Sequence, residues 1–290
     1  MNDFLKLHSK DFNFQQFIRS AFKEDLGDGD HTALATIPSS HKGKMELKVK
    51  ESGIIAGIKA SELIFNYFDN KIKFKPLLKD GQKVKKGQVA FTVEGSTRKL
   101  LSSERLVLNI MQRMSGIATK TDHLQRLCSG TKTRVIDTRK TTPGFRFFEK
   151  WAVVIGGGAN HRYGLYDMIL IKDNHIDFCG GIEKAIDTAN AYLKKRKKKL
   201  NIEVETRNIK DVETVLKHGK VQRIMLDNFS VKDTALAVKL INGRYEVESS
   251  GGITEKNIAS YAKCGVDFIS VGALTHHVKS LDLSLKTLKR

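Results

Sequence analysis

The chain has 290 residues, of which 40% are hydrophobic and 8% aromatic, and its net charge is +19. This length suits two modest domains or one barrel with an attached piece. No apolar run approaches the roughly 18 residues that a membrane-spanning helix requires, and the opening segment MNDFLKLHSKDFNF is too polar for a secretory signal. Cys128, Cys179 and Cys264 lie far apart with no CxxC pair. This usage predicts reduced thiols in a cytoplasmic protein and argues against a disulfide framework or a cysteine-bound metal.

Positive charge is spread along the chain and is not confined to one tail. The densest run, residues 194–199, holds six of the 51 lysines and arginines. It follows an amphipathic stretch, Ile182 to Leu193, so we interpret it as the solvated end of a helix, where cations suit the helix dipole. A nucleic-acid patch is the alternative, but no aromatic residue interleaves the run to stack on bases. The general basicity indicates steering of a small, highly anionic substrate, with neither nucleic acid nor membrane as a partner.

The first hundred or so residues predict an α+β domain. Phe12 to Glu24 has a helical pattern. Alternating segments follow, such as MELKVKES and QVAFTVEG, and glycines at positions 81, 87 and 95 separate short β-prone runs as hairpin turns do. Ser102 to Gly116 then predicts a helix with a Ser-x-Glu start and a glycine stop. We expect residues 1–115 to form this domain, joined by the C-terminal segment of about 276–290.

From residue 134 onward, strands alternate with helices. Six short, nearly continuous apolar segments predict strands buried on both faces: RVIDT (134–138), DMILIKD (167–173), NIEVET (201–206), RIMLDN (223–228), YEVESSGG (245–252) and DFISVGA (267–273). Helical patterns lie between them, such as 212–218, 235–240 and 255–263. The last three strands start about 22 residues apart, a spacing typical of a compact β/α barrel. We therefore expect residues 116–275 to form an incomplete β/α barrel of about six to seven parallel strands.

The ends of these strands carry the residues from which a function can be inferred, because the chemistry of β/α barrels lies at the C-terminal ends of their strands. In chain order the six ends carry Arg139-Lys140, Lys172-Asp173-Asn174, Glu205, Asp227-Asn228, Ser250-Gly251-Gly252 and Gly272. Glycine-rich ends followed by helix starts suit a phosphate group. Acids on neighbouring strands suit Mg²⁺ bound together with phosphates, and the cations suit carboxylates or a pyrophosphate. The sequence therefore predicts a site for a phosphorylated ligand, a metal and a carboxylate-bearing ligand.

The insert between the first two strands adds a candidate ligand contact. It contains Gly156-Gly157-Gly158, which does not match GxGxxG and does not directly follow a strand, so a nucleotide-binding loop is disfavoured. His161 alone is typical of a structural histidine. Because it stands beside Arg162, just before a strand that ends in Lys172, it becomes a candidate ligand contact.

Nine segments occur together along the chain: EDLGDGDHT, SERLVLNIMQRMSGIAT, DTRKTTPG, EKWAVVIGGGANHR, LIKDNH, IEVE, LDN, SSGGI and SVGALTH. In this order they resemble the quinolinate phosphoribosyltransferase family, the carboxylating nicotinate-nucleotide pyrophosphorylases of NAD biosynthesis. The resemblance implies an α/β sandwich domain attached to an incomplete β/α barrel. It also implies a homodimer with shared active sites, with higher oligomers left open. The implied reaction joins quinolinate and phosphoribosyl pyrophosphate to give nicotinate mononucleotide, pyrophosphate and CO₂, with Mg²⁺ and no further cofactor.

The resemblance assigns a role to each residue singled out above. The residues implied to line the pyridine dicarboxylate pocket are Arg139, His161, Arg162 and Lys172, with Lys140 at quinolinate or the pyrophosphate and Arg105 entering the partner's site. Glu205 and Asp227 would hold the ribose hydroxyls and Mg²⁺, the metal largely through the pyrophosphate and water. The 5′-phosphate would lie on Ser250, Gly251, Gly252 and Gly272. The residues expected to be catalytic are Lys140, Lys172, Glu205 and Asp227. The choice of Glu205 over Glu203 rests on the match to IEVE, since both face the same way, and His277 has no assigned role.

Three other functions are alternatives. A phosphoribosyltransferase for nicotinate or another pyridine acid is the nearest, but three candidate arginines plus Lys172 favour a dicarboxylate. The full cation set argues against a paralogue of the same fold associated with molybdate transport. A basic polyanion- or RNA-binding protein would explain the charge. It would not explain Glu205 and Asp227, which would repel a phosphate backbone in the cleft.

Overall fold

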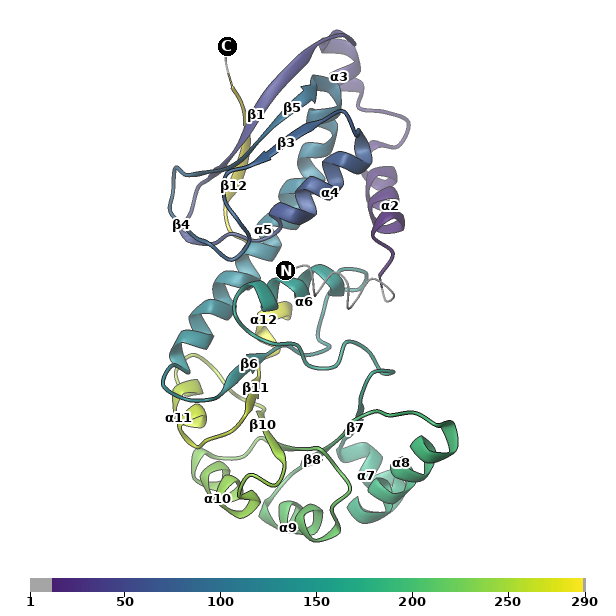
Figure 1. The fold of residues 1–290 in the computed structure, drawn as a ribbon, viewed down its shortest axis with the longest axis vertical. Coiled ribbons are helices and arrows are strands. Elements are labelled where there is room, and N and C mark those ends of the chain that lie inside the picture. Colours follow the sequence, from purple (N-terminus) through teal and green to yellow (C-terminus); the bar gives the residue numbers. More distant parts are fainter. Residues whose placement is uncertain (1–11, 289–290) are drawn as a thin grey trace. The chain divides into compact units, whose positions relative to one another are not determined.

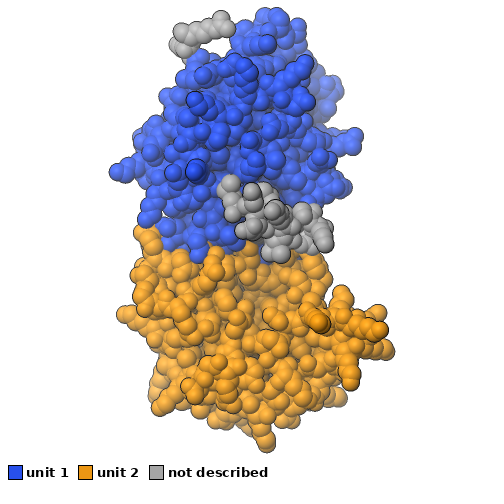
Figure 2. Space-filling model, in the orientation of Figure 1, with its two compact units in different colours: residues 1–122, 141–157, 274–290 blue, residues 123–140, 158–273 orange. Residues whose placement is uncertain are grey.

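A computed structural model describes residues 12–288, and Figure 1 gives its helices and strands. The chain forms two compact units, coloured separately in Figure 2. Unit 1 consists of the described parts of residues 1–122 and 274–290 together with 141–157, and unit 2 consists of residues 123–140 and 158–273. Residues 1–11 of the opening segment that we compared with a secretory signal lie outside the described residues. Among the described helices, none combines the length and apolar character needed to cross a membrane.

Unit 1 is built on a four-stranded antiparallel sheet. Its strand order is β12 (Leu283–Thr287), β1 (Lys42–Val49), β5 (Val89–Ser96), β3 (Lys73–Pro76). Alternate residues of β1 are buried, as expected for a strand with one face on a core. The C-terminal strand pairs with β1, with Leu47 opposite Leu285. The remaining elements of this part of the chain are β2 (Gly53–Ile54), β4 (Lys83–Val84), α2 (Phe14–Leu26), α3 (His31–Thr36) and α4 (Ile58–Phe68); Figure 1 shows α4 alongside the sheet.

The long helix α5 (Thr97–Leu127) corrects the expectation of a helix that stops at Gly116. Gly116 lies inside the helix, where a Cβ atom would come within 2.2 Å of the carbonyl oxygen of Lys279. Glycine is needed there because the C-terminal segment passes against the helix. Gly116 therefore allows close packing and does not end the helix. Helix α5 crosses the division between the two compact units, which falls at residues 122/123.

Residues 141–157, which we expected in the barrel domain, belong to unit 1. They contain α6 (Arg146–Ile155), whose C-cap is Gly156. A Cβ atom on Gly156 would lie 2.5 Å from the carbonyl oxygen of Ala118 on α5. Gly157 adopts φ +88°, in the left-handed region. The close contact at Gly156 and the left-handed backbone at Gly157 explain two of the three consecutive glycines, so no nucleotide-binding role is needed to explain them.

Unit 2 contains all six strands predicted from residue 134 onward, and every pairing among them is parallel. The strand order is β6 (Arg134–Ile136), β11 (Phe268–Ser270), β10 (Glu246–Ser250), β9 (Arg223–Asp227), β8 (Ile202–Thr206), β7 (Ile169–Ile171). Because β6 and β7 are edges of this sheet, the barrel is incomplete, and the predicted fold class is confirmed. The helices of this part are α7 (Asp173–Cys179), α8 (Ile182–Arg196), α9 (Ile209–His218), α10 (Val231–Ile241) and α11 (Ile258–Lys263); Figure 1 shows them outside the curved sheet.

The lysine run lies where the sequence placed it, at the end of a helix. Helix α8 ends at Arg196, and Lys194 and Lys195 lie in its last turn. Lys197 forms the C-cap in the left-handed conformation, with φ 53°. All six cations of the run are exposed, as the interpretation of a solvated helix end requires.

Candidate active site

The parallel sheet of unit 2 places the charged and glycine-rich strand ends along one edge, because parallel strands all end on the same side. We call these residues the strand-end site: Arg139, Lys140, Lys172, Glu205, Asp227, Ser250, Gly251, Gly252 and Gly272. The three cations are exposed, and so is Arg105, which lies on α5 in unit 1. The sheet thus brings together predicted site residues that are spread over more than a hundred positions of the chain.

Two acids of the strand-end site lie on neighbouring strands. Glu205 on β8 is nearly buried, and its Oε2 lies 3.5 Å from Nζ of Lys172. Its Oε1 accepts a hydrogen bond from the backbone N–H of Asp173 at 3.4 Å. Asp227 ends β9, is half-buried, and accepts a 2.7 Å bond from Nδ2 of Asn228. Carboxylate oxygens on adjacent strands are the donor type that Mg²⁺ prefers, so these two acids fit the metal implied by the family resemblance.

The glycine-rich end of β10 is shaped by its neighbour, the end of β9. The backbone N–H of Asn228 donates to the carbonyl of Ser250 at 2.8 Å. Gly251 and Gly252 have φ values of +86° and +62°, and a Cβ atom on Gly251 would lie 2.2 Å from Oδ1 of Asn228. No other residue type fits the backbone at Gly251 without displacing Asn228.

The helices that follow the glycine-rich strand ends are short. We expected a helix start after each glycine-rich end, but the helix that follows Gly252, α11, begins only at Ile258 and has six residues. Helix α12 (Ala273–His276), after Gly272, has four residues. Such short helices add little dipole, so a phosphate at this edge would depend on backbone N–H groups and on the open conformation of the glycines.

Arg162 lies beside the strand-end site and is half-buried. One of its terminal nitrogens, NH1, donates to the carbonyl of Met168 at 3.2 Å. Burial lowers the pKa of Arg162, and the nearby charge of Arg139 lowers it further. The negative charges of Glu203 and Asp167 raise it in turn, so the guanidinium of Arg162 lies among charges of both signs.

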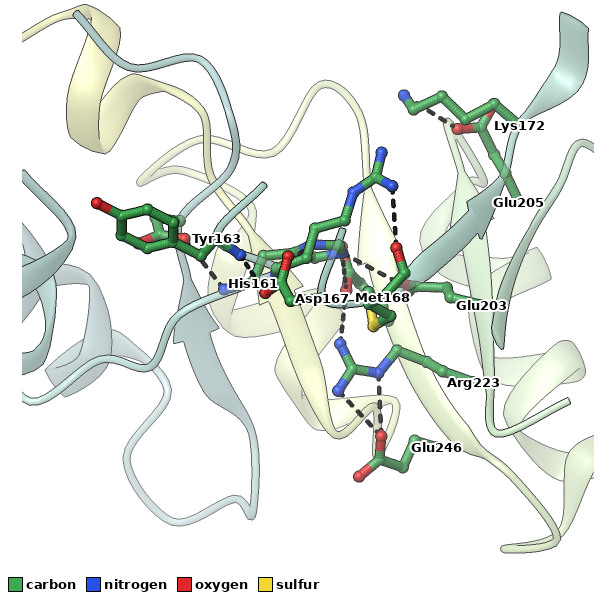
Figure 3. Close-up of polar contacts among 12 residues, drawn as sticks. His161, Tyr163, Asp167, Met168, Lys172, Glu203, Glu205, Arg223 and Glu246 are labelled. Atoms are coloured by element: carbon green, nitrogen blue, oxygen red, sulfur yellow. Dashed lines mark hydrogen bonds and ion pairs between the residues drawn. The ribbon is translucent and has the colours of Figure 1, made fainter. Parts of the chain in front are cut away.

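Behind the strand ends lies a second set of polar residues, which we call the inner cluster: His161, Glu203, Arg223 and Glu248. Nε2 of His161 lies 2.9 Å from Oε2 of Glu203 and 3.4 Å from Oε2 of Glu248. Arg223 donates from NH1 to Glu248 at 3.3 Å and from Nε to Glu246 at 3.0 Å. Figure 3 shows His161, Glu203 and Arg223 as one group and the Lys172–Glu205 pair as another.

Burial changes the acidity of the inner cluster. It raises the pKa of Glu203 to about 7 and that of Glu248 to about 8. The charge of Glu203 raises the pKa of Glu248 further, whereas the positive charge of Arg223 lowers the pKa of both acids. The pair therefore retains a proton near neutral pH, which reduces the negative charge that Arg223 has to balance.

Sequence reasoning missed three members of the inner cluster. Glu203, Arg223 and Glu248 all stand inside strands that are buried on both faces, and both acids have no exposed surface. Charged residues inside apolar strands were the one sequence feature that could have revealed the cluster, because buried charges occur only with partners. Their partners come from other strands, and this pairing could not be deduced from the sequence alone.

The inner cluster could be mistaken for a metal site, because ligand atoms of His161, Glu203 and Glu248 lie within 4.8 Å of one another. The hydrogen bonds of His161 argue against it. The backbone N–H of Arg162 donates to Nδ1 of His161 at 2.7 Å, so Nδ1 carries a lone pair and the proton of the neutral ring is on Nε2. A metal bound at Nε2 would need that proton on Nδ1, where it would point at the N–H of Arg162.

Comparison with protein families gives two matches that together span most of the chain. Residues 30–115 match the N-terminal domain of quinolinate phosphoribosyl transferase, and residues 117–286 match its C-terminal domain. Quinolinate phosphoribosyltransferase (decarboxylating) 1b of Nicotiana tabacum is 44% identical over 290 residues, covering 95% of this chain and 82% of its own. The carboxylating nicotinate-nucleotide pyrophosphorylase of Arabidopsis thaliana is 43% identical, with coverage of 95% and 83%.

Solved structures give the same result. The nicotinate-nucleotide pyrophosphorylase of Francisella tularensis superposes with a TM-score of 0.88 at 39% identity, covering 95% of this chain and 96% of its own. Both the antiparallel sheet of unit 1 and the open parallel sheet of unit 2 therefore have a counterpart of known structure.

The cytoplasmic location expected from the sequence is contradicted by the plant relatives. The Arabidopsis relative is named chloroplastic, and a second Nicotiana tabacum relative, 43% identical over 290 residues, is named mitochondrial. Reduced, unpaired cysteines are compatible with those compartments as well as with the cytoplasm, so cysteine usage could not have decided the location.

Proposed function

The chain belongs to the quinolinate phosphoribosyltransferase family, and from this premise we propose how its residues bind and align the two substrates. It transfers the phosphoribosyl group of phosphoribosyl pyrophosphate to quinolinate with loss of CO₂, giving nicotinate mononucleotide and pyrophosphate, a step of NAD biosynthesis. One observation carries the assignment of roles: exposed cations, paired acids and glycines lie at a single edge of the parallel sheet.

The dicarboxylate binds where several cations lie close together. The charge of Arg139 lowers the pKa of Arg162, so these two cations lie near each other. Lys172 directly follows β7, the strand that the segment of Arg162 leads into. An arginine fork can hold a carboxylate through two parallel hydrogen bonds. His161 lines this pocket through its position beside Arg162, and Lys140, exposed after β6, contacts quinolinate or the pyrophosphate.

Phosphoribosyl pyrophosphate binds along the acids and glycines of β8 to β11. Ser250, Gly251, Gly252 and Gly272 offer backbone N–H groups to the 5′-phosphate. Glu205 and Asp227 hold the ribose hydroxyls, and their oxygens suit a magnesium ion that contacts them largely through pyrophosphate and water. When bound, Mg²⁺ supplies positive charge to the departing pyrophosphate.

The reaction needs no nucleophile from the protein. The quinolinate nitrogen attacks the anomeric carbon as pyrophosphate leaves, and positive charge develops on the ribose ring, close to the carboxylates of Glu205 and Asp227. Lys140 and Lys172 stabilise the anionic groups on either side of the new bond. Holding two polyanions in line can supply roughly 7–11 kcal/mol of the barrier reduction. The positive charge of the alkylated ring nitrogen then stabilises the electron pair left on C2 when the C2 carboxylate departs as CO₂, and C2 takes a proton from water to give nicotinate mononucleotide.

We further propose a homodimer in which Arg105 of one copy completes the site of the other. Arg105 is exposed on α5. Unit 2 carries large apolar side chains in contact with solvent, with Phe178 at 93%, Leu165 at 69% and Tyr166 at 52% exposure. Exposed apolar side chains of this size are typical of surfaces that a partner covers.

The reaction is tested by incubating the protein with quinolinate, phosphoribosyl pyrophosphate and Mg²⁺ while measuring nicotinate mononucleotide and CO₂ together. We expect equal amounts of both, and no mononucleotide when nicotinate replaces quinolinate. Omission of Mg²⁺ should abolish the reaction and its restoration should recover it. Product from nicotinate without CO₂ would instead assign the chain to a monocarboxylate substrate.

Shared active sites are tested by mixing two inactive variants. Arg105→Ala and Asp227→Asn remove residues that the proposal places in the same site but on different copies. After the subunits are exchanged, heterodimers have one intact site, so the mixture should recover up to about a quarter of wild-type activity. A mixture of two Asp227→Asn preparations is the control. No recovery from a mixture that does contain heterodimers would place Arg105 in its own subunit's site or in none.

A further inference from the structure

The inner cluster occupies positions that β/α barrels usually fill with branched apolar side chains. Glu203 and Glu248 have no exposed surface, and the side chains of Arg223 and His161 are only 15% and 6% exposed. Burying ions costs several kcal/mol each unless their geometry is good, so such a cluster is weak support for stability alone. A second role would explain why charged residues stand there.

His161 is bound on both sides by the protein. Its Nε2–H donates to Glu203, and its Nδ1 accepts from the backbone N–H of Arg162. The backbone N–H of His161 itself donates to Oδ1 of Asp137, a fully buried acid that directly follows β6. Both ring nitrogens are thus engaged inside the protein, and the ring is held at the point where the chain turns into Arg162.

Through the contacts of His161, the strands of the sheet fix the position of Arg162. Glu203 stands on β8 opposite Arg223 of β9, and Arg223 in turn bonds Glu246 and Glu248 of β10. The two acids that Nε2 faces therefore come from β8 and β10, and Arg223 of β9 holds one of them, Glu248. Through the ring, the same strands fix the peptide group of Arg162, whose guanidinium is further oriented by the carbonyl of Met168.

We propose that Glu203 and Glu248 are positioning residues for quinolinate: they hold Nε2 of His161, and His161 aims Arg162 through its Nδ1. The inference rests on the proposed role of Arg162 in binding the dicarboxylate. It also refines the role of His161, which acts through Arg162 and offers no ring nitrogen to the substrate.

The first test separates quinolinate binding from folding. Glu203→Gln keeps an oxygen that can accept the Nε2 hydrogen bond, whereas Glu203→Leu removes it. We expect Glu203→Leu to raise the KM for quinolinate about tenfold, with the KM for phosphoribosyl pyrophosphate unchanged within about twofold. Glu203→Gln should restore most of the quinolinate affinity. Val204→Ala is the matched control, because Val204 is fully buried on the same strand and faces the other way.

Two outcomes would overturn the inference. In one, Glu203→Leu changes both KM values alike, as Val204→Ala would. In the other, Glu203→Gln is as damaging as Glu203→Leu, because the acid would then act by its charge and not by its hydrogen bond. A wild-type protein inactive on quinolinate would instead remove the proposed function, and this inference with it.

The second test needs no variant and so does not depend on the folding of one. Nitrogen chemical shifts of the His161 ring in the ligand-free wild type report which nitrogen carries the proton. We expect a neutral ring with the proton on Nε2. The Nδ1–H tautomer, a doubly protonated ring, or shifts that respond to added Zn²⁺ would each contradict the hydrogen-bond chain from Glu203 to Arg162.

Discussion

Strand β8 carries two glutamates that face the same way, Glu203 and Glu205, and their surroundings differ. Glu203 is fully buried and bonds His161 at 2.9 Å, in a cluster completed by Arg223. Glu205 lies at the strand end, where its partner Lys172 is 3.5 Å away and 48% exposed. A distance of two residues along one strand thus separates an acid whose partner is a buried histidine from an acid whose partner is a solvent-facing lysine.

The difference shows how one sheet can hold both a scaffold and a site. In the inner cluster, the positive charge of Arg223 and the protons retained by the acids balance the charges before any ligand arrives. At the strand ends, Arg139, Lys140 and Lys172 are exposed, and under the proposal they contact the anionic groups of the substrates. Substitutions in the two regions should therefore affect different measurements.

The largest expected effect is on stability, from Arg223→Met. This variant leaves Glu203 and Glu248 buried without their cation, and we expect the free energy of unfolding to fall by about 3–5 kcal/mol. Lys172→Met removes a half-exposed cation and should lower it by less than about 1 kcal/mol. Urea denaturation of both variants measures the difference.

The order of the two variants should reverse for activity. Relative to the free energy of unfolding that it loses, Lys172→Met should lose more turnover than Arg223→Met. Lys172→Met should remain folded and lose most of its turnover, because Lys172 belongs to the strand-end site. Lys220→Met provides a control, since Lys220 pairs with exposed Asp187 at 2.8 Å and lies outside both regions. If Lys172→Met unfolded as readily as Arg223→Met, the contrast between scaffold and site would be lost.

A comparable effect on stability should appear in its pH dependence. The pKa of Glu248 is about 8 in the folded protein against an ordinary value of 4.5. Between these values the folded chain holds a proton that the unfolded chain has released. Stability from this group is therefore fully present below about pH 4.5 and is lost as the pH rises toward 8, by about 1.4 kcal/mol per pH unit for one proton.

Glu248→Gln cannot take part in this titration. Its free energy of unfolding should fall less steeply than that of the wild type between about pH 5 and about pH 8. Glu246→Gln is a suitable control, since Glu246 bonds the same arginine but is 49% exposed. Parallel curves for wild type and Glu248→Gln would mean that Glu248 is ionised in the folded protein across this range.

The sequence predicted the strands and their ends because both depend on local patterns. Continuous apolar runs located all six strands of unit 2, and the polar residues that follow them were visible at once. The role of Gly116 was missed because the backbone that approaches it belongs to Lys279, far along the chain. In the same way, alternation placed Glu203 on the face of Glu205 but gave no sign that His161 would meet it.

The smallest expected effects distinguish two adjacent glycines, of which one is enclosed by the protein and the other is open. Gly251 is closed off by the protein, since a Cβ atom would lie 2.2 Å from Oδ1 of Asn228, whereas nothing lies within 4 Å of a Cβ atom on Gly252. Both have positive φ, so an alanine costs about 1 kcal/mol at either position from backbone strain. Gly251→Ala should cost more, because Asn228 must move.

Gly252→Ala should have the larger effect on binding. The open space beside Gly252 is where the proposal puts the 5′-phosphate, so the added methyl group should raise the KM for phosphoribosyl pyrophosphate while leaving the KM for quinolinate unchanged. Steady-state kinetics with each substrate varied in turn, together with thermal unfolding of both variants, would decide the matter. Equal kinetics for Gly252→Ala and wild type would show that the phosphate lies elsewhere along this edge, because a ligand cradled at Gly252 cannot share its space with a methyl group.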